Sequence, residues 1–313
     1  MKNKLLIVTD GKAGHENQSK AFCNALGYEY DCVRAHYPTR FHKALSYLID
    51  RLGLILDYPF KIEPTDGYYS AVVCTGSTAF YPGKIAALRR GIPVAAILYP
   101  SGYKLSTFDC ILAPVFDRPP QQPNILPVPV NLASTNAAFY EEGLSAFRQR
   151  HTPSKPAVAL IVGGPNATST MTAETMKPTL DAFFALTEGR ERWVTTSRRT
   201  PKDVEALIDT LPFDYKLIFS RDTFNPIPAF VSLCERLFVT ADSTGMISEA
   251  VTQGTSCVEV LMTLNGDSSK FARFIRNLEA QNAVHLFDGT LGNANVKISL
   301  APVFEKARAL LKL

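Results

Sequence analysis

Short apolar segments alternate with longer segments of helical periodicity along the whole chain. The first series of apolar segments comprises residues 5–9, 28–33, 71–75, 94–98 and 110–112. The second series comprises residues 158–162, 193–196, 216–219, 237–239 and 257–261. Short buried strands that alternate with helices indicate parallel sheets covered by helices on both faces. The chain is therefore expected to be an α/β protein with two Rossmann-like domains.

A proline-rich and polar stretch separates the two series. Five prolines fall between residues 119 and 129, and the polar segment 148–156 contains Pro153 and Pro156. A chain of 313 residues is long enough for two domains of roughly 150 residues each. We predict an N-terminal domain over residues 1–150 and a C-terminal domain over residues 151–313, which face each other across a cleft. The helical segment 303–311 could pack on either one.

The overall composition limits the classes of partner. The net charge is only +4 and falls in residues 1–150, which argues against a nucleic-acid partner but suits an anionic membrane surface. The six cysteines contain no Cys-x-x-Cys pair, so we expect structural thiols and no zinc. The N-terminal apolar run meets Asp10 too early for a signal peptide, and no apolar stretch reaches about 20 residues. A cytoplasmic location is expected, with peripheral attachment to the inner membrane as an option.

Residues 240–250 have the pattern of a ligand-binding corner between a strand and a helix. N–H groups at a helix start can bind an anion, and a carboxylate one turn further, Glu249, can accept hydrogen bonds from a ribose. A nucleoside diphosphate would suit both. An ordinary turn capped by an aspartate or serine fits the same pattern. The residues of this corner predicted to bind nucleotide are Asp242, Ser243, Gly245, Met246 and Glu249.

Two other loops of the second half also follow predicted strands. Gly163 and Gly164 end one strand, and Ser197, Arg198 and Arg199 follow another. Forked guanidinium donors suit phosphate oxygens, and the carboxyl ends of parallel strands are where such sheets bind ligands. We therefore predict that these five residues also bind the nucleotide. A surface arginine pair is the alternative.

A polar loop follows the first strand. His15 could take a proton from an acceptor hydroxyl at physiological pH, and Asp10 and Glu16 are further candidates for proton transfer. A histidine that only satisfies its own loop is the alternative. A second loop of small residues follows the strand 71–75. The residues expected on the acceptor side are Gly11, Gly14, Asn17, Gln18, Gly76 and Ser77.

Several motifs are absent from the sequence. It contains no Gly-x-Gly-x-x-Gly after a strand, no Gly-x-x-x-x-Gly-Lys-Ser/Thr, no Asp-x-Asp and no Gly-x-Ser-x-Gly. These absences argue against nicotinamide enzymes, P-loop NTPases, metal-clamped nucleotide sugars and serine hydrolases. A bound diphosphate would have to be neutralised by helix N-termini and arginines, so we expect no metal and no cofactor.

The segments 10–18, 163–165, 197–201 and 242–250 together resemble the family of plant mitochondrial-fission factors and their bacterial relatives, which are described as glycosyltransferases. More distantly, the layout resembles GT-B glycosyltransferases, especially the enzyme that adds N-acetylglucosamine to the undecaprenyl-linked peptidoglycan precursor.

This second resemblance implies a role for each loop. The loop with His15 would face the acceptor, and the second domain would hold the nucleotide. Glu249 matches the carboxylate that grips the ribose, Gly163 and Gly164 match a glycine pair that lines the nucleotide site, and residues 243–246 match the diphosphate-binding helix start. The first loop departs from the pattern because it lacks the denser glycine run of that enzyme.

The expected function is a metal-independent GT-B glycosyltransferase that moves a sugar from a nucleoside diphosphate, with UDP favoured, to a hydroxyl of a cell-envelope glycolipid or saccharide. A nucleotide-sugar epimerase would fit the same fold, with Asp10 or Glu16 moving a proton at a sugar carbon. It would need no acceptor. A non-catalytic adaptor on a membrane surface is the third reading, and it should not bind nucleotide.

The segment 34–61 carries more apolar and aromatic residues than one buried helix face needs. Its interior basic residues are Arg40, Lys43 and Arg51, with Lys61 at its end. Such a segment could lie on a membrane, with basic residues at anionic headgroups and aromatic residues at the interface. A helix packed in the core with ordinary solvated charges is the alternative.

Overall fold

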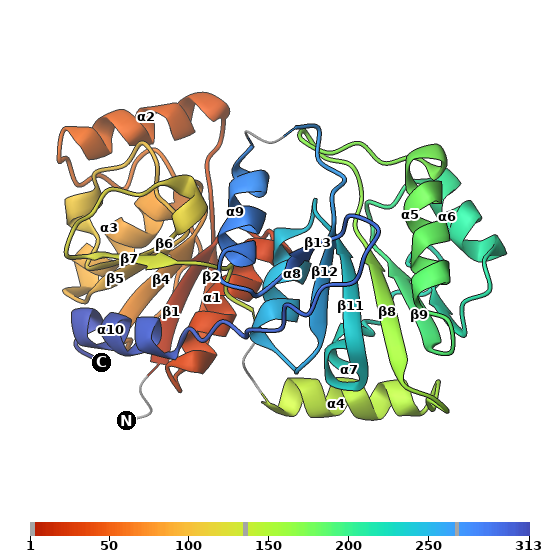
Figure 1. Cartoon of the computed structure of the whole chain (residues 1–313). Helices are drawn as coiled ribbons and strands as arrows, with labels where there is room; N and C mark the ends of the chain where they lie inside the picture. The colour runs from red at the N-terminus through yellow and green to blue at the C-terminus, as the bar shows by residue number, and fades with distance from the viewer. Residues whose placement is uncertain (1–3, 134–136, 267–268) are drawn as a thin grey trace. The chain divides into compact units, whose positions relative to one another are not determined.

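The computed structural model describes residues 4–133, 137–266 and 269–313 (Figure 1). The chain divides into two compact units. Unit 1 comprises Met1–Asn136 and Ser299–Leu313, and unit 2 comprises Ala137–Ile298.

Unit 1 is built on a sheet with the strand order β3-β2-β1-β4-β5-β6-β7, in which only β2 and β3 pair antiparallel. Its strands are β1 (Lys4–Thr9), β2 (Glu29–His36), β3 (Lys61–Ile62), β4 (Ala71–Thr75), β5 (Val94–Ile97), β6 (Cys110–Pro114) and β7 (Ile125–Val128). Its helices are α1 (Ala13–Ala25), α2 (Arg40–Arg51), α3 (Phe80–Arg90) and α10 (Ala301–Leu311), with 3₁₀ turns at Leu105–Thr107 and Val115–Asp117.

Unit 2 is built on a parallel sheet with the strand order β10-β9-β8-β11-β12-β13. Its strands are β8 (Ala157–Val162), β9 (Glu191–Thr196), β10 (Tyr215–Leu217), β11 (Cys234–Thr240), β12 (Cys257–Leu261) and β13 (His285–Leu286). Its helices are α4 (Ala137–Arg148), α5 (Ala173–Leu186), α6 (Lys202–Thr210), α7 (Ile227–Leu233), α8 (Thr244–Thr252) and α9 (Lys270–Glu279).

Both sheets have the same topological switch point. The first strand of each unit, β1 or β8, lies in the middle of its sheet. The next two strands are added on one side of it, and the chain then returns to the other side at β4 or β11. The central strands are buried along their length because helices cover both sheet faces. Ligands of open α/β sheets bind outside the carboxyl ends of the two strands that flank such a point. The loops after β1 and β4 in unit 1, and those after β8 and β11 in unit 2, are therefore the candidate ligand-binding loops.

The predicted α/β class, with two Rossmann-like units, is confirmed. The units differ from the predicted domains because α4 belongs to unit 2 and α10 to unit 1. Phe147 of α4 is fully buried against the rings of Trp193, Tyr215 and Phe230, so the polar stretch after α4 is a loop inside unit 2. No helix among the described residues is both long and apolar enough to cross a bilayer.

Candidate functional site

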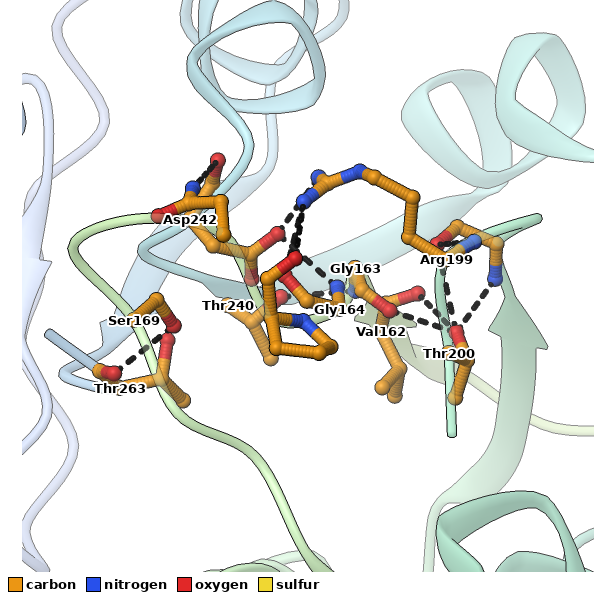
Figure 2. A network of polar contacts seen from close by, with 12 residues as sticks. Val162, Gly163, Gly164, Ser169, Arg199, Thr200, Thr240, Asp242 and Thr263 are labelled. Atoms are coloured by element: carbon orange, nitrogen blue, oxygen red, sulfur yellow. Dashed lines mark hydrogen bonds and ion pairs between the residues drawn. The ribbon is translucent and has the colours of Figure 1, made fainter. Parts of the chain in front are cut away.

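The loops after β8, β9 and β11 meet in unit 2 around the carboxylate of Asp242 (Figure 2). This side chain is inaccessible to solvent. Its Oδ2 atom accepts a hydrogen bond from the Gly164 N–H at 2.9 Å and an ion-paired one from the Arg199 Nη2 at 2.7 Å. Asp242 therefore joins the ends of three neighbouring strands.

Gly163 and Gly164 occupy positions where a side chain would not fit. A Cβ atom on Gly163 would lie 2.2 Å from Asp242 Oδ2, and one on Gly164 would lie 2.2 Å from the Arg199 carbonyl oxygen. The Gly163 N–H also donates to Thr240 Oγ1 at 2.8 Å, at the end of β11. The two glycines thus allow the turn after β8 to pack directly against the loops after β9 and β11.

The loop after β9 clamps this glycine turn from the other side. Arg199 Nη1 donates to the Gly164 carbonyl at 2.8 Å, and Thr200 Oγ1 donates to the Gly163 carbonyl (Figure 2). Ser197 Oγ accepts from the Arg199 N–H at 3.2 Å, so Ser197 shapes the loop. Arg199 remains 40% exposed, and Arg198 is exposed with no side-chain partner among the described residues. Both guanidinium groups are accessible to an anion.

Helix α8 begins at Thr244, and backbone N–H groups of its first turn have no acceptor within the helix. Its first intrahelical bond runs from the Ile247 N–H to the Ser243 carbonyl, and no side chain caps the helix start. The N–H groups of Gly245 and Met246 therefore have no intrahelical acceptor. Gly245 is exposed, with open space where a Cβ atom would stand. The capped-turn alternative is not what the structure contains, and this helix start can accept an anion.

Glu249 lies five residues beyond the start of α8, somewhat deeper than the predicted single turn. Its Oε1 atom accepts a hydrogen bond from the Tyr140 hydroxyl of α4 at 3.0 Å. Burial raises the pKa of the Glu249 carboxyl, and the Tyr140 hydroxyl offsets part of this shift. Burial and the nearby Glu249 charge also raise the pKa of Tyr140. The sequence does not point to Tyr140, because the predicted N-terminal domain of residues 1–150 includes it, whereas the structure places it in unit 2.

Ser169 is a further residue that the sequence did not single out. It lies in the loop after β8 and is fully buried, and its hydroxyl donates to the Thr263 carbonyl at 2.8 Å (Figure 2). This bond fastens the loop that starts with Gly163 to the loop that follows β12. An isolated serine in a polar loop carries no sequence signal for such a role.

In unit 1, His15 is paired with Asp10 at the end of β1. The ring Nδ1 lies 3.1 Å from Asp10 Oδ1, and the Asp10 side chain is only 5% exposed. Burial raises the pKa of Asp10, but the Lys12 backbone N–H and the His15 ring outweigh it and hold this pKa below its usual value. An ionised Asp10 favours the tautomer of His15 that carries its proton on Nδ1, which leaves Nε2 as the basic atom.

The loop after β4 approaches this pair closely. A Cβ atom on Gly76 would lie 2.4 Å from Nδ1 of the His15 ring, and Gly76 has a φ of +86°, so glycine is required there. Ser77 Oγ accepts from Lys43 Nζ of α2 at 2.7 Å. The structure therefore brings Asp10, His15, Gly76 and Ser77 together at the switch point of unit 1.

The other predicted residues of unit 1 are more peripheral. Glu16 is ion-paired with Lys20 at 2.6 Å, which occupies its carboxylate. Gln18 Nε2 donates weakly to the Gly14 carbonyl at 3.4 Å, and Asn17 is exposed. Gly11 adopts a φ of +77° in the turn after β1. No group of three His, Cys, Asp or Glu side chains within the described residues could hold a metal ion, and metal independence stays a prediction.

Two Rossmann-like units, each with a polar loop cluster at the switch point of a mainly parallel sheet, define the GT-B class of fold. The family model described as Mitochondrial fission ELM1 matches residues 13–312 of the sequence. The chain belongs to this family, as its sequence motifs predicted.

Solved structures share this architecture at low sequence identity. The UDP-GlcNAc 2-epimerase from Neisseria meningitidis, bound to UDP-GlcNAc, has a TM-score of 0.51 at 13% identity and covers 99% of this chain and 100% of its own. A UDP-glucosyltransferase from Polygonum tinctorium has a TM-score of 0.50 at 9% identity, with coverages of 100% and 94%. The S. aureus MnaA–UDP structure has a TM-score of 0.50 at 11% identity and covers 99% of this chain and 97% of its own. No curated protein sequence matches the chain. These likenesses establish the fold.

Proposed function

We propose that the protein is a metal-independent glycosyltransferase that transfers a sugar from a nucleoside diphosphate to a hydroxyl of a cell-envelope glycolipid or saccharide in the cytoplasm. The observation that carries this proposal is the corner of unit 2 around Asp242. It combines a glycine turn that accepts no side chain, an uncapped helix start and two accessible arginines. The helix start and the arginines offer donors that could neutralise a diphosphate without a metal, and the glycine turn holds their loops together.

The donor would bind to unit 2 in a defined orientation. Its diphosphate would accept hydrogen bonds from the Gly245 and Met246 N–H groups and from the guanidinium of Arg198, while Glu249 would accept from the ribose hydroxyls. The Neisseria protein is bound to UDP-GlcNAc and the S. aureus protein to UDP, which supports a UDP-sugar as the donor.

The acceptor would be activated by His15 of unit 1. Asp10 would accept a hydrogen bond from the proton on Nδ1 of His15, which leaves Nε2 free to take the proton of the acceptor hydroxyl. As that proton leaves, the hydroxyl oxygen of the acceptor bonds to the anomeric carbon of the donor sugar. The bond between that carbon and the diphosphate breaks in the same step. The negative charge of the leaving diphosphate would be neutralised by the helix start and the arginines.

A nucleotide-sugar epimerase is the second candidate, because a solved 2-epimerase shares the two-unit fold over nearly the whole of both chains. An epimerase returns the removed proton to the other face of the sugar and needs no acceptor. Incubation of the protein with UDP-sugar alone therefore separates the two candidates. An isomeric UDP-sugar in the proton NMR spectrum would favour the epimerase.

The test of the transferase is a release assay with a panel of UDP-sugars and a lipid extract as acceptor. Acceptor-dependent release of UDP by the wild type, lost in the His15→Ala variant, would support the proposal. Release that ignores the acceptor, or that is unaffected by the His15 change, would reject the assigned base. Failure of wild type to bind any nucleotide would favour the adaptor reading.

A further inference from the structure

Helix α2 of unit 1 presents apolar side chains to solvent. Phe41 and Leu48 are 69% and 55% exposed, and Leu52, at the end of the helix, is 65% exposed. With 3.6 residues per turn, these three positions fall on one line along the helix. The side chains that α2 buries in the unit are those of Ser46, Ile49 and Asp50. A surface helix normally carries polar residues on its solvent face, whereas the solvent face of α2 carries apolar ones.

The segment that follows α2 widens this apolar face. Leu54, Ile55, Leu56 and Tyr58 are all exposed. The Tyr81 hydroxyl of α3 holds the segment in place, because it accepts from the Leu56 N–H at 3.2 Å.

Ring contacts join this segment to the start of the helix. The ring of Tyr58 lies edge-on to His42, with 5.4 Å between ring centroids, and His42 contacts Phe41 in the same manner. The segment therefore returns along α2 and forms one continuous face with it. We name this face the α2 surface, and its members are Phe41, Leu48, Leu52, Leu54, Ile55, Leu56 and Tyr58.

The α2 surface is a concentration of exposed apolar groups rather than ordinary scatter. Of the fourteen large apolar side chains that are exposed in the described part of the chain, seven belong to it. Figure 1 shows α2, in orange, at the margin of unit 1. Contiguous apolar surface of this kind marks an interaction site.

The charges around the α2 surface are positive. The basic residues between positions 40 and 61 are Arg40, Lys43, Arg51 and Lys61. The two acidic residues of the same stretch are neutralised by bases of α3, since Asp50 is ion-paired with Lys84 and Asp57 with Arg89. Arg40 and Arg51 are exposed, and the hydrogen bond of Arg51 goes to a neutral carbonyl.

We propose that the α2 surface docks unit 1 onto an anionic lipid bilayer. The apolar side chains would enter the boundary between headgroups and acyl chains, and the arginines would contact anionic headgroups. The positive rim favours a bilayer over a second copy of this chain, whose identical basic rim would oppose it across the contact.

The docking would also place unit 1 near a lipid-linked acceptor. Helix α2 carries Lys43, whose ammonium donates to Ser77 in the loop beside His15. Lys43 lies on the side of α2 opposite Phe41, so a lipid at the α2 surface would lie one helix diameter, about 10–12 Å, from the acceptor-side loop, a consequence that rests on the proposed function. Docking itself does not depend on sugar transfer, so the test below measures binding alone.

The experiment is sedimentation of the full chain with vesicles of phosphatidylcholine, with or without phosphatidylglycerol. We expect wild type to pellet with the anionic vesicles and much less with the neutral ones. The Arg40→Gln/Arg51→Gln variant should partition about 30-fold more weakly, because each basic residue near an anionic surface contributes about 1 kcal/mol. The Leu48→Ser/Ile55→Ser variant should lose about 100-fold through lost apolar burial.

Matched controls remove the same groups from unit 2. Arg148→Gln/Lys155→Gln removes two exposed charges, and Leu186→Ser/Leu291→Ser removes two exposed leucines. Both controls should bind vesicles as wild type does, and circular dichroism should show that all variants are folded. Wild type that pellets with neither vesicle would overturn the proposal, as would equal losses in the controls. A wild-type dimer that the Leu48→Ser/Ile55→Ser change makes monomeric, without vesicle binding, would assign the surface to self-association instead.

Discussion

Replacement of Asp242 tests whether the corner of unit 2 is held together as described. In Asp242→Ala the buried Gly164 N–H loses its acceptor, and an unsatisfied buried donor costs about 1–3 kcal/mol. The lost ion pair adds less than about 1 kcal/mol, because Arg199 is 40% exposed and water screens it. We therefore expect a loss of about 1–4 kcal/mol in the free energy of unfolding. Asp242→Asn keeps an oxygen for Gly164 and should lose about 1 kcal/mol.

The same pair of variants separates a structural from a direct ligand role. Asp242 organises Gly164 and Arg199 and is itself inaccessible, so Asp242→Asn should keep most of the UDP affinity while Asp242→Ala should lose it. Urea unfolding measures the free energy of unfolding, and titration calorimetry measures the UDP affinity. The control is Asp209→Ala, which breaks an exposed ion pair with Arg221 and should change neither. Equal results for Asp242→Ala and the control would refute the reasoning.

Three further predictions concern the two switch points. Glu249→Ala should weaken nucleotide binding by about 1.5–3 kcal/mol in calorimetry without unfolding the protein, and an unchanged affinity would remove Glu249 from the site. His15→Ala should lower turnover by about 10² to 10⁴ with little change in donor affinity, whereas full activity would move the base to Asp10 or Glu16. The third prediction concerns pH. Burial raises the pKa of Glu249, and only its ionised carboxylate accepts hydrogen bonds from the ribose. Nucleotide affinity should therefore be complete above that raised pKa and be lost as the pH falls through it, at a higher pH than for an ordinary glutamate. Tyr140→Phe removes the hydroxyl that lowers the pKa of Glu249, so the loss of affinity should move to still higher pH. In Glu249→Gln this pH dependence of affinity should disappear. A wild type whose affinity depends on pH as that of Glu249→Gln does would contradict the assignment.

The sequence predicted the central strands of both sheets because these are short apolar runs buried on both faces. The prediction for 257–261 matches β12, and that for 71–75 matches β4. It missed β7, which lies in the proline-rich stretch. Pro127 is tolerated there because β7 is an edge strand, where a missing N–H leaves no ladder bond unmade. The two-residue strands β3 and β13 are too short to show a pattern.

The positions of the candidate loops could also be predicted, because carboxyl ends of neighbouring parallel strands meet at one edge of a sheet. The contacts within the loops could not. Arg199 and Asp242 are 43 residues apart, and Tyr140 and Glu249 are 109 apart. Such pairs are created by the order of the strands and by the packing of α4, which a single sequence does not reveal. The His15–Asp10 pair spans five residues, yet its geometry depends on the tight turn at Gly11.

The central claim is that unit 2 binds a nucleoside diphosphate sugar. Thermal and urea unfolding in the presence of UDP, UDP-sugars and unrelated nucleotides tests it most directly. Ligand at about 100 times its dissociation constant should stabilise wild type by about 2.7 kcal/mol, and the same concentration should stabilise Glu249→Ala much less. The predicted result is stabilisation by UDP or a UDP-sugar that is larger in wild type than in Glu249→Ala. No stabilisation by any nucleotide, in a wild-type protein that is folded, would contradict the claim and leave the non-catalytic reading.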